Sequence, residues 1–158
     1  MSVYRKILVP IDGSPTSNRG LIEAIELART QHATLRLVHV LDELILGPGA
    51  EAVVYLENTV ELLREAGRQV VAKAEAVVRK SGLKSESVVL EIMGGRAADS
   101  IVAEANAWGA DLIVLGTHGR RGVKRLVMGS DAEQVIRMTQ VPVLLVRAKA
   151  TPGTSGKR

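Results

Sequence analysis

The sequence predicts an α/β fold built on one open, five-stranded parallel sheet with helices on both faces. Short apolar runs rich in Val, Ile and Leu alternate along the chain with longer segments of helical periodicity, which is typical of parallel strands joined by right-handed crossovers. Runs such as "LIVL" and "VLLV" contain no alternating polar residues, and this indicates strands covered on both faces. A chain of 158 residues suits one domain with a substantial core.

Strands are predicted from apolar, β-branched runs and helices from a three-four spacing of apolar residues. The strands are expected at 5–12, 34–41, 87–93, 111–116 and 141–147, and the helices at 15–31, 50–80, 97–108 and 130–140. We find no internal linker and interpret residues 1–148 as one domain. The small, polar segment 149–158 is expected to be a disordered tail.

The long second helix carries an apolar stripe that needs a partner. Its members are Val53, Leu56, Val60, Leu63, Gly67, Val70, Ala74 and Val77. A coiled coil would satisfy this spacing, but a zipper needs a longer repeat, so a single helix between two strands is expected to pack on the sheet.

Composition excludes several classes of protein. The chain has no cysteine, which rules out disulfides and thiol catalysis and suits a reducing compartment. The first ten residues carry two charges and a short apolar run, and no later apolar run approaches the ~20 residues of a membrane span. We therefore expect a soluble cytoplasmic protein without a membrane partner.

The net charge of +4 is concentrated in one loop. Of the 21 Lys and Arg, four lie there (Arg120, Arg121, Lys124 and Arg125), and the remaining 17 match the 17 Asp and Glu. One basic loop suits a small anion better than a long polyanion. With no Phe, one Trp and two Tyr, the chain also has little with which to stack bases, so no nucleic-acid partner is expected.

Ligands of open α/β sheets bind beyond the carboxyl ends of the strands, where the strand order reverses. After the first strand, "IDGSPTS" places Asp12 at the strand end, Gly13 in a sharp turn, and Ser14 with Pro15 at a helix start. This is compatible with a plain turn. An acidic residue at this place also suits a ribose or a cation.

The second loop, 116–130, combines its cations with glycines. Gly116, Gly119 and Gly129 allow the backbone to approach an anion closely, and Ser130 begins a helix whose N–H groups favour phosphate. "SDAE" also fits a capping box between Ser130 and Glu133, and the two interpretations are compatible because a cap leaves other first-turn donors available.

The sequence contains no clear motif for a dinucleotide fold, a phosphate loop, a metal site or a catalytic centre. The chain lacks a G-x-G-x-x-G motif, and "GTSGKR" at 153–158 is too short for a phosphate loop. His39 is expected to be a buried or edge residue of a strand, whereas His118 could contact phosphate. No spacing suggests a metal cage and no nucleophile has a base nearby in sequence, so we assign neither metal ligands nor catalytic residues.

These motifs resemble the universal stress protein family. Gly116-x2-Gly119-x9-Gly129-Ser130 is similar to that family's nucleotide-binding motif, and "ILVPIDGS" at 7–14 is similar to its first strand and turn. "RLVHVL", "ADLIVLGTHG" and "VPVLLVR" resemble later strands, so the likeness runs from about 3 to 147. It implies an adenine-nucleotide alpha-hydrolase-like sheet with strand order 3-2-1-4-5.

By resemblance to ATP-binding members, Asp12 and the Val40 backbone would meet the adenosine end, Gly116 the ribose, and Gly119, Gly129 and Ser130 the phosphates. The full implied set of cofactor-binding residues is Pro10, Ile11, Asp12, Ser14, Val40, Gly116, Thr117, Gly119, Arg120, Arg121, Gly129, Ser130 and Asp131. The implied cofactor is ATP, or AMP or ADP, with Mg.

Asp131 departs from the family pattern, in which many members carry a small apolar residue. It could repel phosphate, help hold Mg²⁺, or favour the helix start through the helix dipole.

The resemblance implies a regulatory role. Nucleotide would order residues 117–129 and so alter a homodimer formed through 141–147, or contacts with an unknown protein partner. A slow ATPase or adenylyl-group enzyme on the same fold, and a nucleotide-free scaffold, are the alternatives.

Overall fold

The computed structural model describes residues 3–42, 53–117 and 128–147, without the side chains of residues 53–58. Its strands are β1 (Lys6–Pro10), β2 (Thr34–Asp42), β3 (Ser85–Ile92), β4 (Leu112–Gly116) and β5 (Val143–Val146). They form one parallel sheet in the order β3-β2-β1-β4-β5. The helices are α1 (Pro15–Gln31), α2 (Val53–Lys80), α3 (Ala97–Trp108) and α4 (Ser130–Met138). The predicted fold class and strand order are confirmed.

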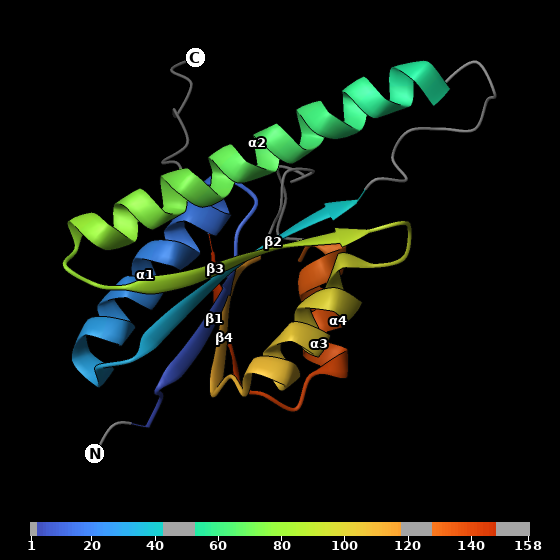
Figure 1. The fold of residues 1–158 in the computed structure, drawn as a ribbon. Helices are drawn as coiled ribbons and strands as arrows, with labels where there is room; N and C mark the ends of the chain where they lie inside the picture. Colours follow the sequence, from blue (N-terminus) through green and yellow to red (C-terminus); the bar gives the residue numbers. More distant parts are fainter. Residues whose placement is uncertain (1–2, 43–52, 118–127, 148–158) are drawn as a thin grey trace, which may run out of the picture.

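The sheet lies between two helical layers, with α1 and α2 on one face and α3 and α4 on the other (Figure 1). The central strand β1 shows why its apolar run does not alternate. Ile7 and Val9 pack in the cluster under α1 and α2, whereas Leu8 packs in the cluster under α3 and α4. All three side chains are fully buried, as expected of a strand covered on both faces.

Helix α1 begins as its sequence predicts. Ser14 is the N-cap residue, its Oγ accepts from the Ser17 N–H at 3.2 Å, and Pro15 occupies the first turn. Further along, Gly20 brings the helix close to β4, since an added Cβ would lie 3.5 Å from the Gly116 nitrogen.

Helix α2 packs on the sheet as predicted, and the predicted stripe is wrong at Val77. Val71 and Val78 are buried against the core, whereas Val77, which the stripe included, is 38% exposed. Gly67 and Ala74, like Val70 and Val77, are seven residues apart, which corresponds to a period of 3.5. A straight helix has 3.6 residues per turn, so the buried face drifts relative to a seven-residue repeat. After two turns it is therefore centred on Val78 rather than on Val77.

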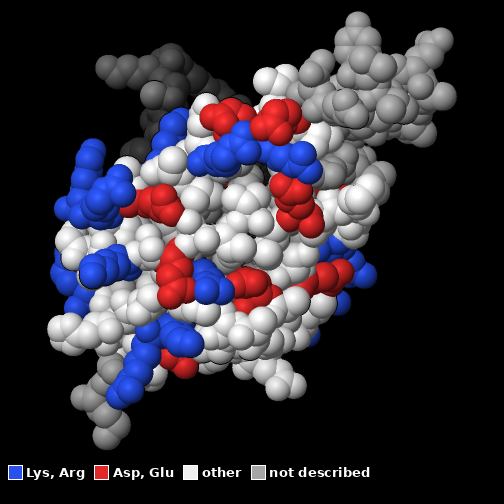
Figure 2. Space-filling view, viewed as in Figure 1, with Lys and Arg blue, Asp and Glu red and all other residues white. Residues whose placement is uncertain are grey.

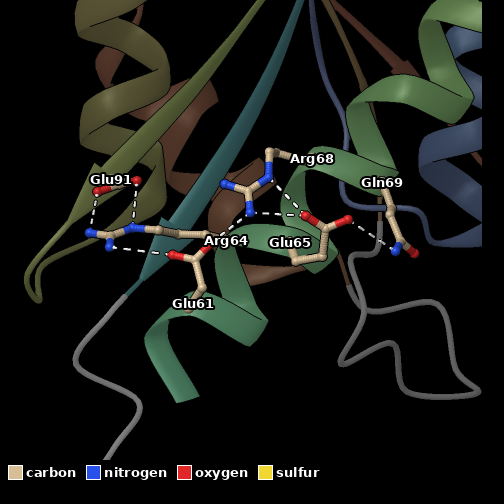
Figure 3. A network of polar contacts seen from close by, with 6 residues as sticks. All are labelled: Glu61, Arg64, Glu65, Arg68, Gln69 and Glu91. Carbon is tan, nitrogen blue, oxygen red and sulfur yellow. Dashed lines mark hydrogen bonds and ion pairs between the residues drawn. The ribbon is translucent and has the colours of Figure 1, made fainter. Parts of the chain in front are cut away.

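The outer surface of α2 carries a network of ion pairs and hydrogen bonds that reaches β3. It is formed by Glu61, Arg64, Glu65, Arg68, Gln69 and Glu91 (Figure 3). Arg64 donates to both carboxylate oxygens of Glu91 at 3.0 Å and so ties the helix to β3. The hydrogen bond that Arg68 donates holds the pKa of Glu65 below its ordinary value. On the face shown in Figure 2, basic and acidic side chains are intermixed.

Element ends differ from the predicted ones by a few residues. Strand β1 stops at Pro10 rather than at residue 12, and α4 stops at Met138 rather than at residue 140. The expected tail, 149–158, lies outside the described residues. Within the described segments, no helix has the length and apolarity that a membrane crossing requires.

Candidate functional site

The site predicted from sequence lies where the sheet order reverses. Strand β1 pairs with β2 on one side and with β4 on the other. Since all the strands are parallel, the segments that follow β1 and β4 leave the same edge of the sheet next to each other. This is the usual position of a ligand site in an open α/β sheet.

The turn after β1 holds Asp12 through its own backbone and side chains. The Asp12 carboxylate accepts from the Ser14 N–H at 2.8 Å, and the Asp12 N–H donates to Ser17 Oγ at 3.1 Å. Gly13 has φ +79°, a conformation that favours glycine. Asp12 does not end the strand as predicted, because the chain turns away from the sheet after the Ile11 N–H has bonded to the Val38 carbonyl at 2.8 Å. Sequence reasoning missed Ser17, although a hydroxyl near a helix start is a common local acceptor.

Gly116 is needed where β4 meets the start of α1. A Cβ at this position would lie 2.8 Å from the Thr16 carbonyl carbon and 2.9 Å from the Thr16 oxygen. Both are backbone atoms, so they cannot turn aside. Close packing of helix on strand therefore accounts for this glycine, and a ribose contact remains a prediction.

Thr117 joins the two ends of the basic loop. Its N–H donates to the Val146 carbonyl at 3.0 Å, and its carbonyl accepts from the Gly129 N–H at 2.6 Å. The residue is 6% exposed. The start of α4 is thereby held beside the carboxyl ends of β4 and β5. Gly119, Arg120 and Arg121, like His118, lie outside the described residues.

The predicted capping box at α4 is wrong. Gly129, with φ −60° and ψ 148°, occupies the N-cap position, no side chain bonds there, and Ser130 is the first helical residue. The Glu133 carboxylate turns instead to Arg137, at 2.7 Å. Because the cap residue is a glycine, its position provides no side-chain acceptor, and first-turn N–H groups remain available to an anion. Asp131 lies exposed in this turn, where an acid favours the helix dipole.

Val40 and His39 form the β2 side of this edge. The Val40 side chain packs in the cluster under α3 and α4. His39 is 5% exposed, and its Nδ1 lies 2.8 Å from the Ile11 carbonyl oxygen, so the expectation of a buried, satisfied histidine is confirmed. Its link to the turn after β1 was missed, because the two residues lie 28 positions apart and no local pattern connects them.

The polar groups that the structure brings to this edge come mostly from the backbone. In the part of the chain that the structure describes, no three His, Asp or Glu side chains converge as a metal cluster. The features that the structure brings together here are the Asp12 turn, the Val40 backbone, the Thr117 hydrogen bonds and the uncapped start of α4. The edge therefore offers mainly backbone donors and acceptors, as suits an anionic ligand with a polar base.

Fold and site together define a doubly wound α/β protein with a ligand site at the point where its sheet reverses. The chain belongs to the universal stress protein family, whose sequence model matches residues 3–147. Universal stress protein MJ0531 of Methanocaldococcus jannaschii is 36% identical over 147 residues, which cover 92% of this chain and 84% of that protein.

Solved structures of family members have a similar fold. The hypothetical protein MJ0577 of the same organism has a TM-score of 0.83 and 26% identity, and the match covers 94% of this chain and 99% of that one. A universal stress protein from Archaeoglobus fulgidus, solved in complex with dAMP, has a TM-score of 0.63 and 26% identity, with coverage of 91% and 98%.

Proposed function

We propose that this protein binds an adenine nucleotide, with ATP as the main ligand, at the edge formed by β1, β2 and β4, and that it acts as a nucleotide-dependent regulator. The observation that carries the proposal is Gly129. Its φ of −60° is open to any residue, so conformation does not call for a glycine at this helix start. Close approach of a phosphate would call for a glycine there. The dAMP complex of the Archaeoglobus relative supports an adenine nucleotide.

In the proposed complex, the adenosine end meets Asp12 and the Val40 backbone, while Gly129 and Ser130 meet the phosphates. Asp131 lies one residue further into α4 and would help to hold the Mg²⁺ of the bound nucleotide. The remaining proposed contacts come from Pro10, Ile11, Ser14, Gly116, Thr117, Gly119, Arg120 and Arg121.

Two glycine variants separate binding from folding. Gly129→Ala adds a Cβ at an allowed conformation and should weaken Mg·ATP binding by ~10-fold or more. Its loss of stability should stay below ~1 kcal/mol, because alanine is a poorer N-cap residue than glycine. Gly109→Ala is the matched control. Gly109 caps α3 at φ +73° with nothing within 4 Å of an added Cβ, so this variant should lose ~1 kcal/mol of stability and keep its affinity.

The measurement is calorimetric titration of nucleotide-stripped protein with Mg·ATP and Mg·AMP. We expect a dissociation constant below ~100 µM, equivalent to about −5.5 kcal/mol. Absence of heat at millimolar ATP at two temperatures would refute the site and favour a nucleotide-free scaffold. Phosphate release at steady turnover, lost in Asp131→Asn, would assign an ATPase instead.

The regulatory part of the proposal rests on β5. This strand ends the sheet, pairs with β4 along one side, and presents Leu144 at 37% exposure. An apolar edge strand of this kind favours pairing with another strand, and we assign it to a second copy of the chain. Leu144→Asp should yield monomers in sedimentation velocity, and ATP should shift the wild-type equilibrium. A monomeric wild type at every ATP concentration would contradict this arrangement.

A further inference from the structure

His39 lies in β2 immediately before Val40, and its ring is buried between the sheet and α2. A Cβ added at Gly67 would lie 3.0 Å from the ring Cδ2 and 3.2 Å from Nε2, so the glycine leaves the room that the imidazole occupies. On the other side, Nδ1 lies 2.8 Å from the Ile11 carbonyl oxygen. Because a carbonyl oxygen only accepts, Nδ1 carries a proton and donates it.

The hydrogen bonds between β1 and β2 show which way the β2 backbone faces. The Thr34 N–H donates to the Arg5 carbonyl at 2.8 Å, and the Val38 carbonyl accepts from the Ile11 N–H at 2.8 Å. The even-numbered residues of β2 therefore turn their N–H and C=O groups toward β1. Val40 follows the same rule, and its two backbone groups point past the end of β1.

One further rung of a regular parallel ladder would join the Val40 N–H to the Ile11 carbonyl. The paired register stops at Pro10 and Val38, so this rung is not formed, and the Ile11 carbonyl is bonded by the His39 ring instead. We infer that His39 is a positioning residue for base recognition: by holding the Ile11 carbonyl, it ends the ladder one rung early and leaves the Val40 N–H available to the edge of an adenine.

This inference rests on the nucleotide site proposed above and gives it a source of base selectivity. Val40 offers one donor and one acceptor in the same direction, and adenine presents an acceptor at N1 beside a donor at its exocyclic amine. With ribose and phosphates held elsewhere, guanine presents the opposite order. A site whose polar groups would be left unpaired by the wrong base rejects it.

Two variants isolate the hydrogen bond from the volume of the ring. His39→Asn keeps an N–H donor on Cγ, where Nδ1 stands, whereas His39→Leu has a similar size and no donor. In nucleotide-free protein, a through-hydrogen-bond coupling between the Val40 nitrogen and the Ile11 carbonyl carbon should be absent from the wild type and from His39→Asn. It should appear in His39→Leu, and the Val40 amide should then exchange more slowly with solvent.

Titrations with Mg·ATP, Mg·GTP and inorganic tripolyphosphate provide the functional test. His39→Leu should lose roughly 3- to 10-fold of its affinity for ATP, the worth of about one hydrogen bond, with its preference for ATP over GTP reduced to match. Tripolyphosphate binding should be unchanged, and His39→Asn should restore most of the preference.

Equal loss for all three ligands would overturn the inference, because a purely structural role would weaken every ligand alike. A Val40 to Ile11 coupling already present in the wild type would overturn it too. If the wild type binds no nucleotide while the coupling changes as expected, the nucleotide site is refuted and the part that His39 plays in ending the ladder stands.

Discussion

Alanine at Gly116 and alanine at Gly20 are expected to have opposite effects, although the two glycines face each other across the contact between α1 and β4. The Cβ of Gly116→Ala would lie 2.8 Å from the Thr16 carbonyl carbon and 2.9 Å from its oxygen. Carbon atoms in ordinary contact lie ~3.5–4.0 Å apart. The first turn of α1 would therefore have to move by about 0.7 Å or more, because backbone atoms cannot rotate out of the way.

Overpacking of this kind costs ~1–3 kcal/mol, and in a domain of this size each kcal/mol lowers the melting temperature by ~2–4 °C. We expect Gly116→Ala to melt about 2–12 °C below the wild type. In Gly20→Ala the nearest atom would be the Gly116 nitrogen at 3.5 Å, an ordinary contact. Alanine within a helix is better than glycine by up to ~1 kcal/mol, so this variant should be as stable as the wild type or more so.

Equilibrium urea unfolding measures both effects, followed by far-UV circular dichroism and by the fluorescence of Trp108, the one tryptophan of the chain. Wild-type stability in Gly116→Ala would refute the packing argument. Equal losses in the two variants would refute the contrast, since they would show that the contact tolerates neither methyl group.

Two further predictions follow from the polar contacts. Ser14→Ala removes the acceptor of the Ser17 N–H and should lower the free energy of unfolding in urea by ~1 kcal/mol. Ser14→Asp supplies another acceptor and should recover most of this loss. An unchanged urea midpoint in the alanine variant would contradict the cap. Arg68 holds the pKa of Glu65 below its ordinary value, so the small stability from this pair is present above the unfolded pKa and is lost as pH falls through the lower folded pKa. Arg68→Gln should raise the Glu65 pKa in a carboxyl NMR titration, and an unmoved pKa would show that the pair does not form in solution.

Features encoded within a few neighbouring residues could be predicted from the sequence. The segment "IDGSPTS" specifies a turn and a helix start by itself, and the structure places the cap at Ser14 as predicted. The strand order was predicted from the family resemblance instead. Gly116, Gly129 and Ser130 have the spacing of the family motif, and the members of that family share the topology.

Features that depend on contacts between distant segments could not be predicted. The close approach of Gly116 to Thr16, and the bond from His39 to Ile11, join residues far apart in sequence. The cap at α4 failed for a different reason. Serine is the better capping residue, but Gly129 adopts the extended conformation that the cap position requires, and Ser130 is thereby moved into the first turn.

Gly116 and Gly129 of the predicted motif are therefore glycines for different physical reasons. Gly116 lies against the backbone of α1, and this packing would require a glycine in a protein that bound nothing. Gly129 has a conformation that any residue could adopt, and it stands at the uncapped end of a helix, where a side-chain acceptor would stabilise the fold. Gly129 lacks this side-chain acceptor at the edge where we propose that the nucleotide binds, and close approach of a phosphate would explain its presence. We therefore expect the motif residues at the start of α4, rather than Gly116, to make the main contacts with the nucleotide.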